Sequence, residues 1–185
     1  MFVAQMALDV VPEYARISLR AVDTVVARFL EQPAQLERTL DQGFRAMQGR
    51  QPALAEYMAA EIAQLPLPRV QGLAYFLAVF TYRSFEEAFG PRLARIELRD
   101  INRMLERLIT DSELRSQWAS GVTYSEDAIA IGQPALVQLL REEIDRAARD
   151  EPEIAWEAID PFYESLLVAV LTLTNAVHPD VIHSS

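Results

Sequence analysis

Residues 68–89 read PRVQGLAYFLAVFTYRSFEEAF and give the first indication of the architecture. Proline at the start of this segment suits the first turn of a helix, where a backbone N–H has no partner inside the helix. In the first half, large apolar side chains point in almost every direction around a helix, and a helix without a polar face normally lies at the centre of a domain. The second half, from Arg83 to Glu87, is amphipathic. The segment therefore predicts a central helix that reaches the surface near its carboxyl end.

Helical signals recur on both sides of this segment, whereas no stretch shows the sustained polar–apolar alternation of a β-strand. Prolines start several apolar segments and glycines precede some of them, which is typical of helix–turn–helix connections. The sequence thus predicts an all-α fold, a compact bundle of about eight helices. The predicted helices span residues 12–30, 33–48, 52–64, 68–89, 91–110, 112–119, 134–149 and 153–177. We expect residues 121–132 to be a loop with one short turn, and Pro161 to kink or split the last helix.

The composition limits the classes of function. A chain of 185 residues can bury a substantial core, and we expect residues 1–180 to form a single helical domain, with residues 181–185 as a flexible tail. The 27 acidic and 17 basic residues give a net charge of −10. This charge argues against nucleic-acid binding, which needs a basic surface, and it favours basic partners.

Localisation is also constrained by residue types. The absence of cysteine excludes disulfides and thiolate metal sites, and it fits a reducing cytoplasm. The first residues lack the basic region of a signal peptide. The apolar run at residues 166–177 contains Thr172, Thr174 and Asn175 and is too short to span a bilayer. We therefore expect a cytoplasmic protein without membrane contact.

Two segments resemble each other within the chain. Residues 51–62 (QPALAEYMAAEI) and 133–144 (QPALVQLLREEI) share six of twelve residues at an offset of 82, and a long apolar segment follows each. One interpretation is a duplicated helical unit, residues 51–89 and 133–177, as in solenoid-type binding proteins. The other is coincidence, since proline, alanine and leucine are common at helix starts. In both cases Pro52 and Pro134 are expected in the first turn of a helix.

A set of carboxylates on two successive helices is the first candidate site. Glu142 and Asp145 form an i, i+3 pair on one helix, and Glu157 and Asp160 form a second pair on the next. Mg²⁺ prefers such carboxylate oxygens. The layout resembles that of all-helical nucleoside triphosphate pyrophosphohydrolases of the MazG type, although Asp145 stands where that pattern has glutamate and Pro161 follows the second pair. The resemblance implies a Mg²⁺-dependent phosphohydrolase; the alternative is a solvated acidic face.

Arginines mark a second candidate surface on the helix predicted at residues 91–110. Helical spacing places five of them on one face: Arg92, Arg95, Arg99, Arg103 and Arg107. Such a face could bind an acidic partner or a phosphate, or it could be an exposed face balanced by Asp100 and Glu106. The same helical wheel places Glu97 on the apolar side. A buried acid there would indicate either a functional site or a structural salt bridge.

The remaining candidates concern contacts rather than catalysis. Tyr75, Phe76, Phe80 and Tyr82 could line a small-molecule pocket or simply fill the core. The only histidines are His178 and His183, and the chain contains no Glu-x-x-His pair, nucleophile elbow or phosphate-binding loop.

We therefore predict a non-enzymatic helical protein that acts through protein–protein contacts, without a cofactor; a Mg²⁺-dependent enzyme and a small-molecule-binding bundle are the alternatives. The apolar arm at residues 1–11 is unlikely to remain exposed to water. This arm, or an apolar helix face, predicts a homodimer.

Overall fold

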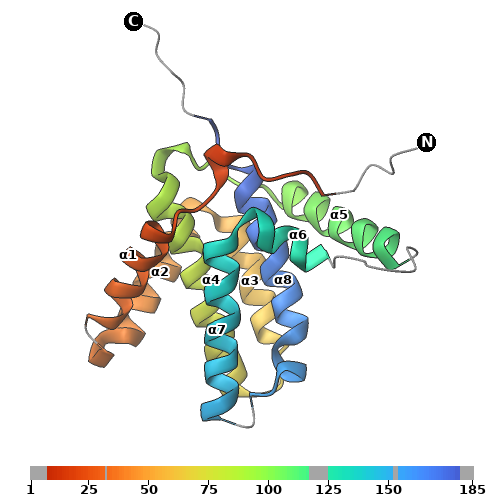
Figure 1. Ribbon diagram of the computed structural model, residues 1–185. Coiled ribbons are helices and arrows are strands. Elements are labelled where there is room, and N and C mark those ends of the chain that lie inside the picture. The colour runs from red at the N-terminus through yellow and green to blue at the C-terminus, as the bar shows by residue number, and fades with distance from the viewer. Residues whose placement is uncertain (1–7, 32, 117–124, 152–153, 180–185) are drawn as a thin grey trace, which may run out of the picture.

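The computed structural model in Figure 1 describes residues 8–31, 33–116, 125–151 and 154–179. These residues form α-helices and short 3-10 turns, and the only strand-like feature among them is one isolated bridge between Leu93 and Val177. The α-helices are α1 Leu19–Leu30, α2 Leu36–Arg50, α3 Pro52–Ala63, α4 Pro68–Phe89, α5 Leu98–Ser116, α6 Ser125–Gly132, α7 Pro134–Asp150 and α8 Trp156–Asn175. The 3-10 turns are η1 Glu13–Ala15, η2 Pro33–Gln35 and η3 Gly90–Arg92. The predicted all-α bundle of about eight helices is confirmed.

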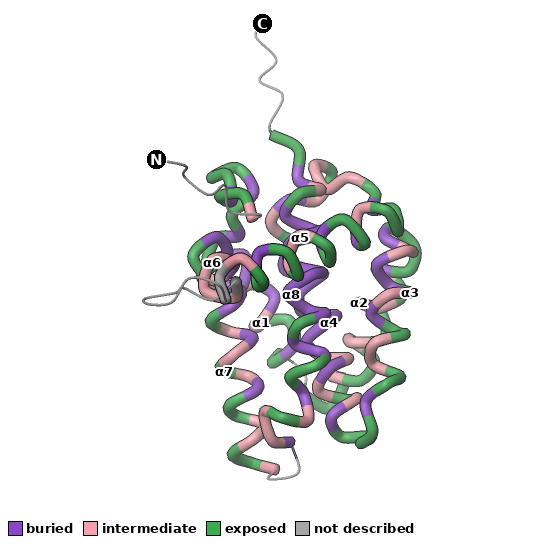
Figure 2. The backbone as a smooth tube through the Cα atoms, turned by 90° about the vertical axis from the view of Figure 1, so that its right-hand side faces the viewer, coloured by how far each residue is buried: buried purple, intermediate pink, exposed green. Residues whose placement is uncertain are grey.

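Helices α4 and α8 pack against each other at the centre of the bundle. Residues 77–82 of α4 and residues 165–174 of α8 are buried without interruption, and Figure 2 shows both helices as the most buried part of the chain. Helices α1 and α2 pack on α4, helices α5 and α6 pack on α8, and α3 and α7 each contact both central helices. The apolar segment at residues 68–89 is therefore central because it has apolar neighbours on nearly every side.

Several predicted helix boundaries were wrong. The predicted helices at 91–110 and 112–119 are replaced by a single α5, which starts only at Leu98 and continues past residue 111. Gly90, with a φ of 43°, ends α4, and Pro91 lies in the short turn η3, after which the chain is extended. The first helix likewise starts at Leu19 rather than at residue 12. Conversely, α6 forms where a loop was predicted, and α8 runs through Pro161 as one helix.

Two buried glutamines explain why the chain is extended before α1 and α5. The Gln133 side chain accepts a hydrogen bond from the Ile17 N–H (2.9 Å) and donates one to the Ala15 carbonyl (2.7 Å). Gln51 accepts a bond from the Ile96 N–H (2.7 Å) and donates one to the Ala94 carbonyl (2.8 Å). Each amide thus satisfies a buried N–H and a nearby C=O that would otherwise need a helix or a sheet.

These glutamines directly precede the two prolines singled out in the sequence. Pro52 and Pro134 lie in the first turn of α3 and α7, so that prediction is confirmed. The backbone angles of Gln51 (φ −132°, ψ 60°) and Gln133 (φ −129°, ψ 59°) are nearly the same. The two segments therefore share their local conformation as well as their sequence.

The segment that leads into α1 covers the chain's own core. Val11 is buried and touches Gly132, where an added Cβ would lie 2.3 Å from a Val11 methyl group. Leu8 is partly buried against the same core, whereas Val10 remains 86% exposed. The part of the predicted dimerisation arm before Leu8 lies outside the described residues, and of the part described, Leu8 and Val11 pack within the same chain.

We expect Gln133→Leu to lower the free energy of unfolding by about 2–4 kcal/mol, because it leaves the Ile17 N–H and the Ala15 carbonyl buried without partners. Urea unfolding monitored by circular dichroism measures this loss. Gln138→Leu, on the exposed face of the same helix, is the control and should change stability by no more than about 0.5 kcal/mol. Equal stability of the two variants would contradict the role of Gln133.

A second prediction concerns the contact of Val11 with Gly132. Gly132→Ala should destabilise the fold by about 1–3 kcal/mol, since the new methyl group overlaps a stiff valine side chain. Combining it with Val11→Ala should restore part of the loss, which a double-mutant cycle of unfolding measures. Gly72→Ala, where the added methyl group meets nothing within 4 Å apart from the adjoining residues and backbone of its own helix, should instead stabilise α4. A purely additive double mutant would contradict this packing.

Candidate functional site

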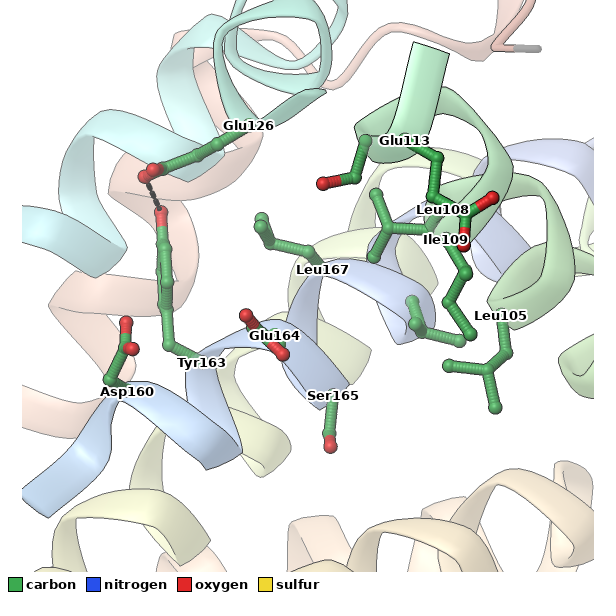
Figure 3. A pocket seen from close by; sticks show the side chains of 12 residues that line it. Leu105, Leu108, Ile109, Glu113, Glu126, Asp160, Tyr163, Glu164, Ser165 and Leu167 are labelled. Carbon is green, nitrogen blue, oxygen red and sulfur yellow. Dashed lines mark hydrogen bonds between the residues drawn. The ribbon is translucent and has the colours of Figure 1, made fainter. Parts of the chain in front are cut away.

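A cavity of about 410 Å³ lies between α5, α6 and α8 (Figure 3). Its volume is in the range of ligand-binding cavities. Leu108, Leu167 and Val168 supply apolar surface between α5 and α8. Leu105 and Ile109 belong to the same wall but remain 38% and 50% exposed.

The apolar wall follows from the register of α5. Leu105, Leu108 and Ile109 are spaced at i, i+3 and i+4, so they share one helix face, and this face looks toward α8. The opposite wall comes from α8, where Leu167 and Val168 belong to its long buried run. Between these two faces lies the hollow, which is open toward the exposed side chains of Leu105 and Ile109.

The rim of the cavity is acidic. Glu113 lies on the α5 side, Glu126 on α6, and Asp160 and Glu164 on the α8 side (Figure 3). Asp160 and Glu164 are exposed to solvent. Carboxylates beside apolar walls favour a ligand that is both apolar and positively charged.

One end of the cavity is held by a cluster from three helices. The Tyr163 hydroxyl donates a hydrogen bond to Glu126 (2.8 Å), and the Arg141 guanidinium forms an ion pair with the same carboxylate (2.6 Å). Burial, and next the nearby Glu126 carboxylate, raise the pKa of the Tyr163 phenol. The phenol therefore stays protonated at neutral pH and acts as a hydrogen-bond donor. Arg141 balances the charge of Glu126.

The buried hydroxyl on the cavity's other side is also engaged. Ser165 donates a hydrogen bond to Glu61 on α3 (2.7 Å) and is itself mostly buried. Its hydroxyl therefore ties α8 to α3. What the cavity presents to a ligand is thus mainly aliphatic surface and carboxylates.

The structure does not bring together the four carboxylates of the predicted magnesium site. Glu142 accepts a hydrogen bond from Gln138 (2.9 Å), and Asp145 accepts one from the Trp156 indole (2.8 Å). Glu157 is exposed in the first turn of α8, and Asp160 lines the cavity. Within the described ranges, no three histidine or acidic side chains are arranged so that they could hold a metal ion.

The predicted five-arginine face is not formed as one helix face, because α5 starts at Leu98. Arg92 lies in η3 over the Phe89 ring, and Arg95 lies in the extended segment. Only Arg99, Arg103 and Arg107 are on α5. Arg107 pairs with Asp9 (2.7 Å) and Arg103 approaches Asp100 (3.9 Å). A shallow hollow of about 250 Å³ beside Thr172 is lined by Arg95, Arg103 and Arg107.

The prediction of a buried acid at Glu97 was wrong. Its side chain is 57% exposed and lies 4.0 Å from the Arg95 guanidinium. Glu97 directly precedes α5, and its backbone N–H donates a hydrogen bond to Asp100 (3.0 Å). The helical wheel misplaced this residue because it assumed a helix that begins several residues earlier.

The aromatic set fills space between helices. The Phe76 and Phe80 rings lie 5.9 Å apart and both contact Phe29 on α1, at 5.7 and 5.9 Å. Tyr75 instead packs on Phe44 of α2, and Tyr82 is almost completely buried. A separate hollow of about 290 Å³ lies beside Phe29, toward Gly43 and Arg83.

The sequence identified only Asp160 among the residues that line the cavity. The signal that could have revealed the rest was the apolar spacing of Leu105, Leu108 and Ile109, read in the register of a helix that starts at Leu98. Glu164 and Tyr163 could not be recognised from the sequence, because their position at the cavity depends on which helices pack against α8.

Comparison with known proteins adds no functional information. No protein family model, no curated protein and no solved structure matches the chain. Among the helices that the structure describes, none combines the length and the apolar character needed to cross a membrane.

The raised pKa of Tyr163 predicts a loss of stability in alkali. Above pH 10.0, the ordinary phenol value, the unfolded chain releases this proton while the folded chain retains it, so stability falls as the pH rises. Tyr163→Phe should therefore lose less stability than the native protein between about pH 8 and pH 11, as urea unfolding at each pH measures. Tyr14→Phe, at an exposed tyrosine, is the control. An unchanged alkaline loss in Tyr163→Phe would contradict the buried phenol–carboxylate contact.

Proposed function

We propose that this chain is a non-enzymatic binding protein that acts through contact with another protein, and that the contact is made at the cavity between α5, α6 and α8. The observation that carries the proposal is an open cavity of about 410 Å³ whose apolar wall continues to the protein surface at Leu105 and Ile109. Exposed apolar side chains grouped around a hollow are a common mark of a contact site.

The chemistry of the lining supports binding rather than catalysis. Aliphatic side chains provide contact area, while the hydroxyls of Tyr163 and Ser165 are engaged by Glu126 and Glu61. A tyrosine phenol is already neutral at neutral pH, and burial raises the pKa of Tyr163 further, so its phenol is a poor general base there. These groups fix helices in position and leave surface complementarity as the main property of the cavity.

The shape of the site favours a protein partner over a small metabolite. An enclosed pocket buries most of a small ligand, whereas here Ile109 is half exposed at the outer edge. An apolar centre with a polar rim is the usual anatomy of a protein interface. A partner helix could insert one or two anchoring side chains while its backbone remains outside the cavity.

The experiment starts from a photo-crosslinking amino acid introduced at Ile109, in cells that produce the protein. We expect a discrete crosslinked partner at this position and none with the crosslinker at Glu56, an exposed residue on α3. The partner is then identified, purified and titrated by calorimetry. The variant Leu105→Glu/Ile109→Glu should weaken its binding at least about tenfold, because it introduces charge into the apolar wall.

The outcomes separate three cases. A partner whose affinity falls in the double variant supports the proposal. A crosslinked product made of two copies of this chain also supports it, and it makes the partner a second copy, in line with the predicted homodimer; light scattering at micromolar concentration then gives twice the monomer mass. Absence of any crosslink specific to Ile109, or a partner that binds the double variant unchanged, would overturn it.

A further inference from the structure

The chain contains a second pair of similar segments. Residues 12–20 read PEYARISLR and residues 91–99 read PRLARIELR, with six of nine positions identical. These are the extended segments held by the buried glutamines. We call residues 12–89 the first half and residues 91–178 the second half. Gln51 of the first half binds the segment of the second, and Gln133 of the second half binds the segment of the first.

We propose that the two halves are copies of one four-helix unit, and that the binding cavity is the place where the second copy lacks an aromatic core cluster present in the first. The corresponding ligand is a segment of a partner protein that inserts an aromatic or leucine side chain and carries arginine or lysine beside it. This inference rests on the proposed function and specifies its partner.

Burial supports the equivalence of α1 with α5 and of α3 with α7. With the offset of 79 residues set by the repeated segment, three buried positions at or just before α1 correspond to buried positions at or just before α5, and exposed Leu19 corresponds to exposed Leu98. The buried pairs are Ile17 and Ile96, Val22 and Ile101, and Val25 and Met104. With the offset of 82, the buried pairs of α3 and α7 are Leu54 and Leu136, Ala55 and Val137, and Met58 and Leu140.

Hydrogen bonds support the equivalence of α4 with α8, at an offset of 88. Tyr75 donates its hydroxyl to Asp41 on α2 (3.1 Å), and Tyr163 donates its hydroxyl to Glu126 on α6 (2.8 Å). Ser84 and Thr172 also correspond at this offset, and each hydroxyl donates a hydrogen bond to the backbone carbonyl four residues earlier. The helix contacts agree, since α1 and α2 pack on α4 as α5 and α6 pack on α8.

The equivalence shows what is missing at the cavity. In the first half, Phe29, Phe76 and Phe80 form a cluster of three rings between α1 and α4, with centroids 5.7 to 5.9 Å apart. The corresponding residues of the second half are Leu108, Glu164 and Val168, and all three line the cavity. Smaller side chains and one carboxylate thus replace three aromatic rings, which leaves the space open.

The first half also indicates what would fill that space. Aromatic rings complete the packing between α1 and α4, so an aromatic or large aliphatic side chain from a ligand suits the matching space between α5 and α8. Glu164 stands where the first half has Phe76, and Asp160 lies one turn away on the same helix. These exposed carboxylates favour a basic residue next to the inserted side chain and disfavour an acidic one.

The test uses a synthetic helical peptide with phenylalanine and leucine on one face and lysine on the other, titrated into the full chain by calorimetry. A second peptide has glutamate in place of every lysine. We expect the lysine peptide to bind with an affinity that falls as salt is added, and the glutamate peptide to bind at least about tenfold more weakly.

Specificity for the cavity is tested with a substitution that restores the first half's residue. Glu164→Phe should weaken binding of the lysine peptide at least about tenfold, because the new ring fills the cavity. Glu56→Phe is the matched control: it makes the same change in charge and size at an exposed site on α3 and should leave binding within about twofold. Since Glu164 is also exposed, both variants should fold, which circular dichroism checks.

Equal binding of the two peptides, or equal effects of the two phenylalanine variants, would overturn the inference. Failure of both peptides would overturn it as well. If the partner crosslinked at Ile109 nevertheless binds through the cavity, the proposed function stands and only the partner chemistry is wrong. If no partner is crosslinked at Ile109, the proposed function itself fails.

Discussion

Two glutamine side chains impose the constraint on which the rest of the structure depends. A backbone segment that enters a helical core without being helical must find partners for its N–H and C=O groups. Gln133 supplies both for the segment at Ala15 and Ile17, and Gln51 does so for the segment around residue 95. Where these segments end, α1 and α5 begin. The register of α5, and with it the face that lines the cavity, therefore depends on the Gln51 amide, which directly precedes α3 and lies more than forty residues earlier in the chain.

This dependence explains what could be predicted from the sequence and what could not. The bounds of α4 were predicted to the residue, because a proline and a long apolar run define them locally. The start of α5 was not, because local spacing favours a helix from residue 91, whereas contacts with Gln51 and with the backbone of residues 176–178 hold the segment extended. The errors at Glu97 and at the predicted arginine face both follow from this one displaced start. Tertiary contacts overrode local propensity there.

The candidate site illustrates a different limit. The spacing of the carboxylates on α7 and α8 is that of known metal ligands and predicted a metal site. Asp145 instead accepts a hydrogen bond from Trp156, and the described part of the chain holds no three such side chains that could bind a metal ion. The cavity residues predicted no site, because leucine and isoleucine at helical spacing ordinarily belong to the hydrophobic core. Whether such a face is covered depends on the size of the side chains opposite it. The space beside Glu164 and Val168 is recognised only by comparison with the aromatic rings at the corresponding positions, Phe76 and Phe80.

The two halves of the chain depend on each other because the glutamine of each half binds the extended segment of the other. Each half contains the extended segment that the other half's glutamine satisfies, so a cut in the connection near Gly90 would leave both fragments with unpaired buried groups until they met again. The halves should thus behave as a split protein that reassembles on mixing. By the same reasoning, a single unit on its own could pair the buried backbone groups of its extended segment only by associating with a second copy, in which each copy's glutamine binds the extended segment of the other. In the present chain both glutamines belong to one polypeptide. The effective concentration of one half at the other is therefore fixed by the covalent link and does not depend on the protein concentration.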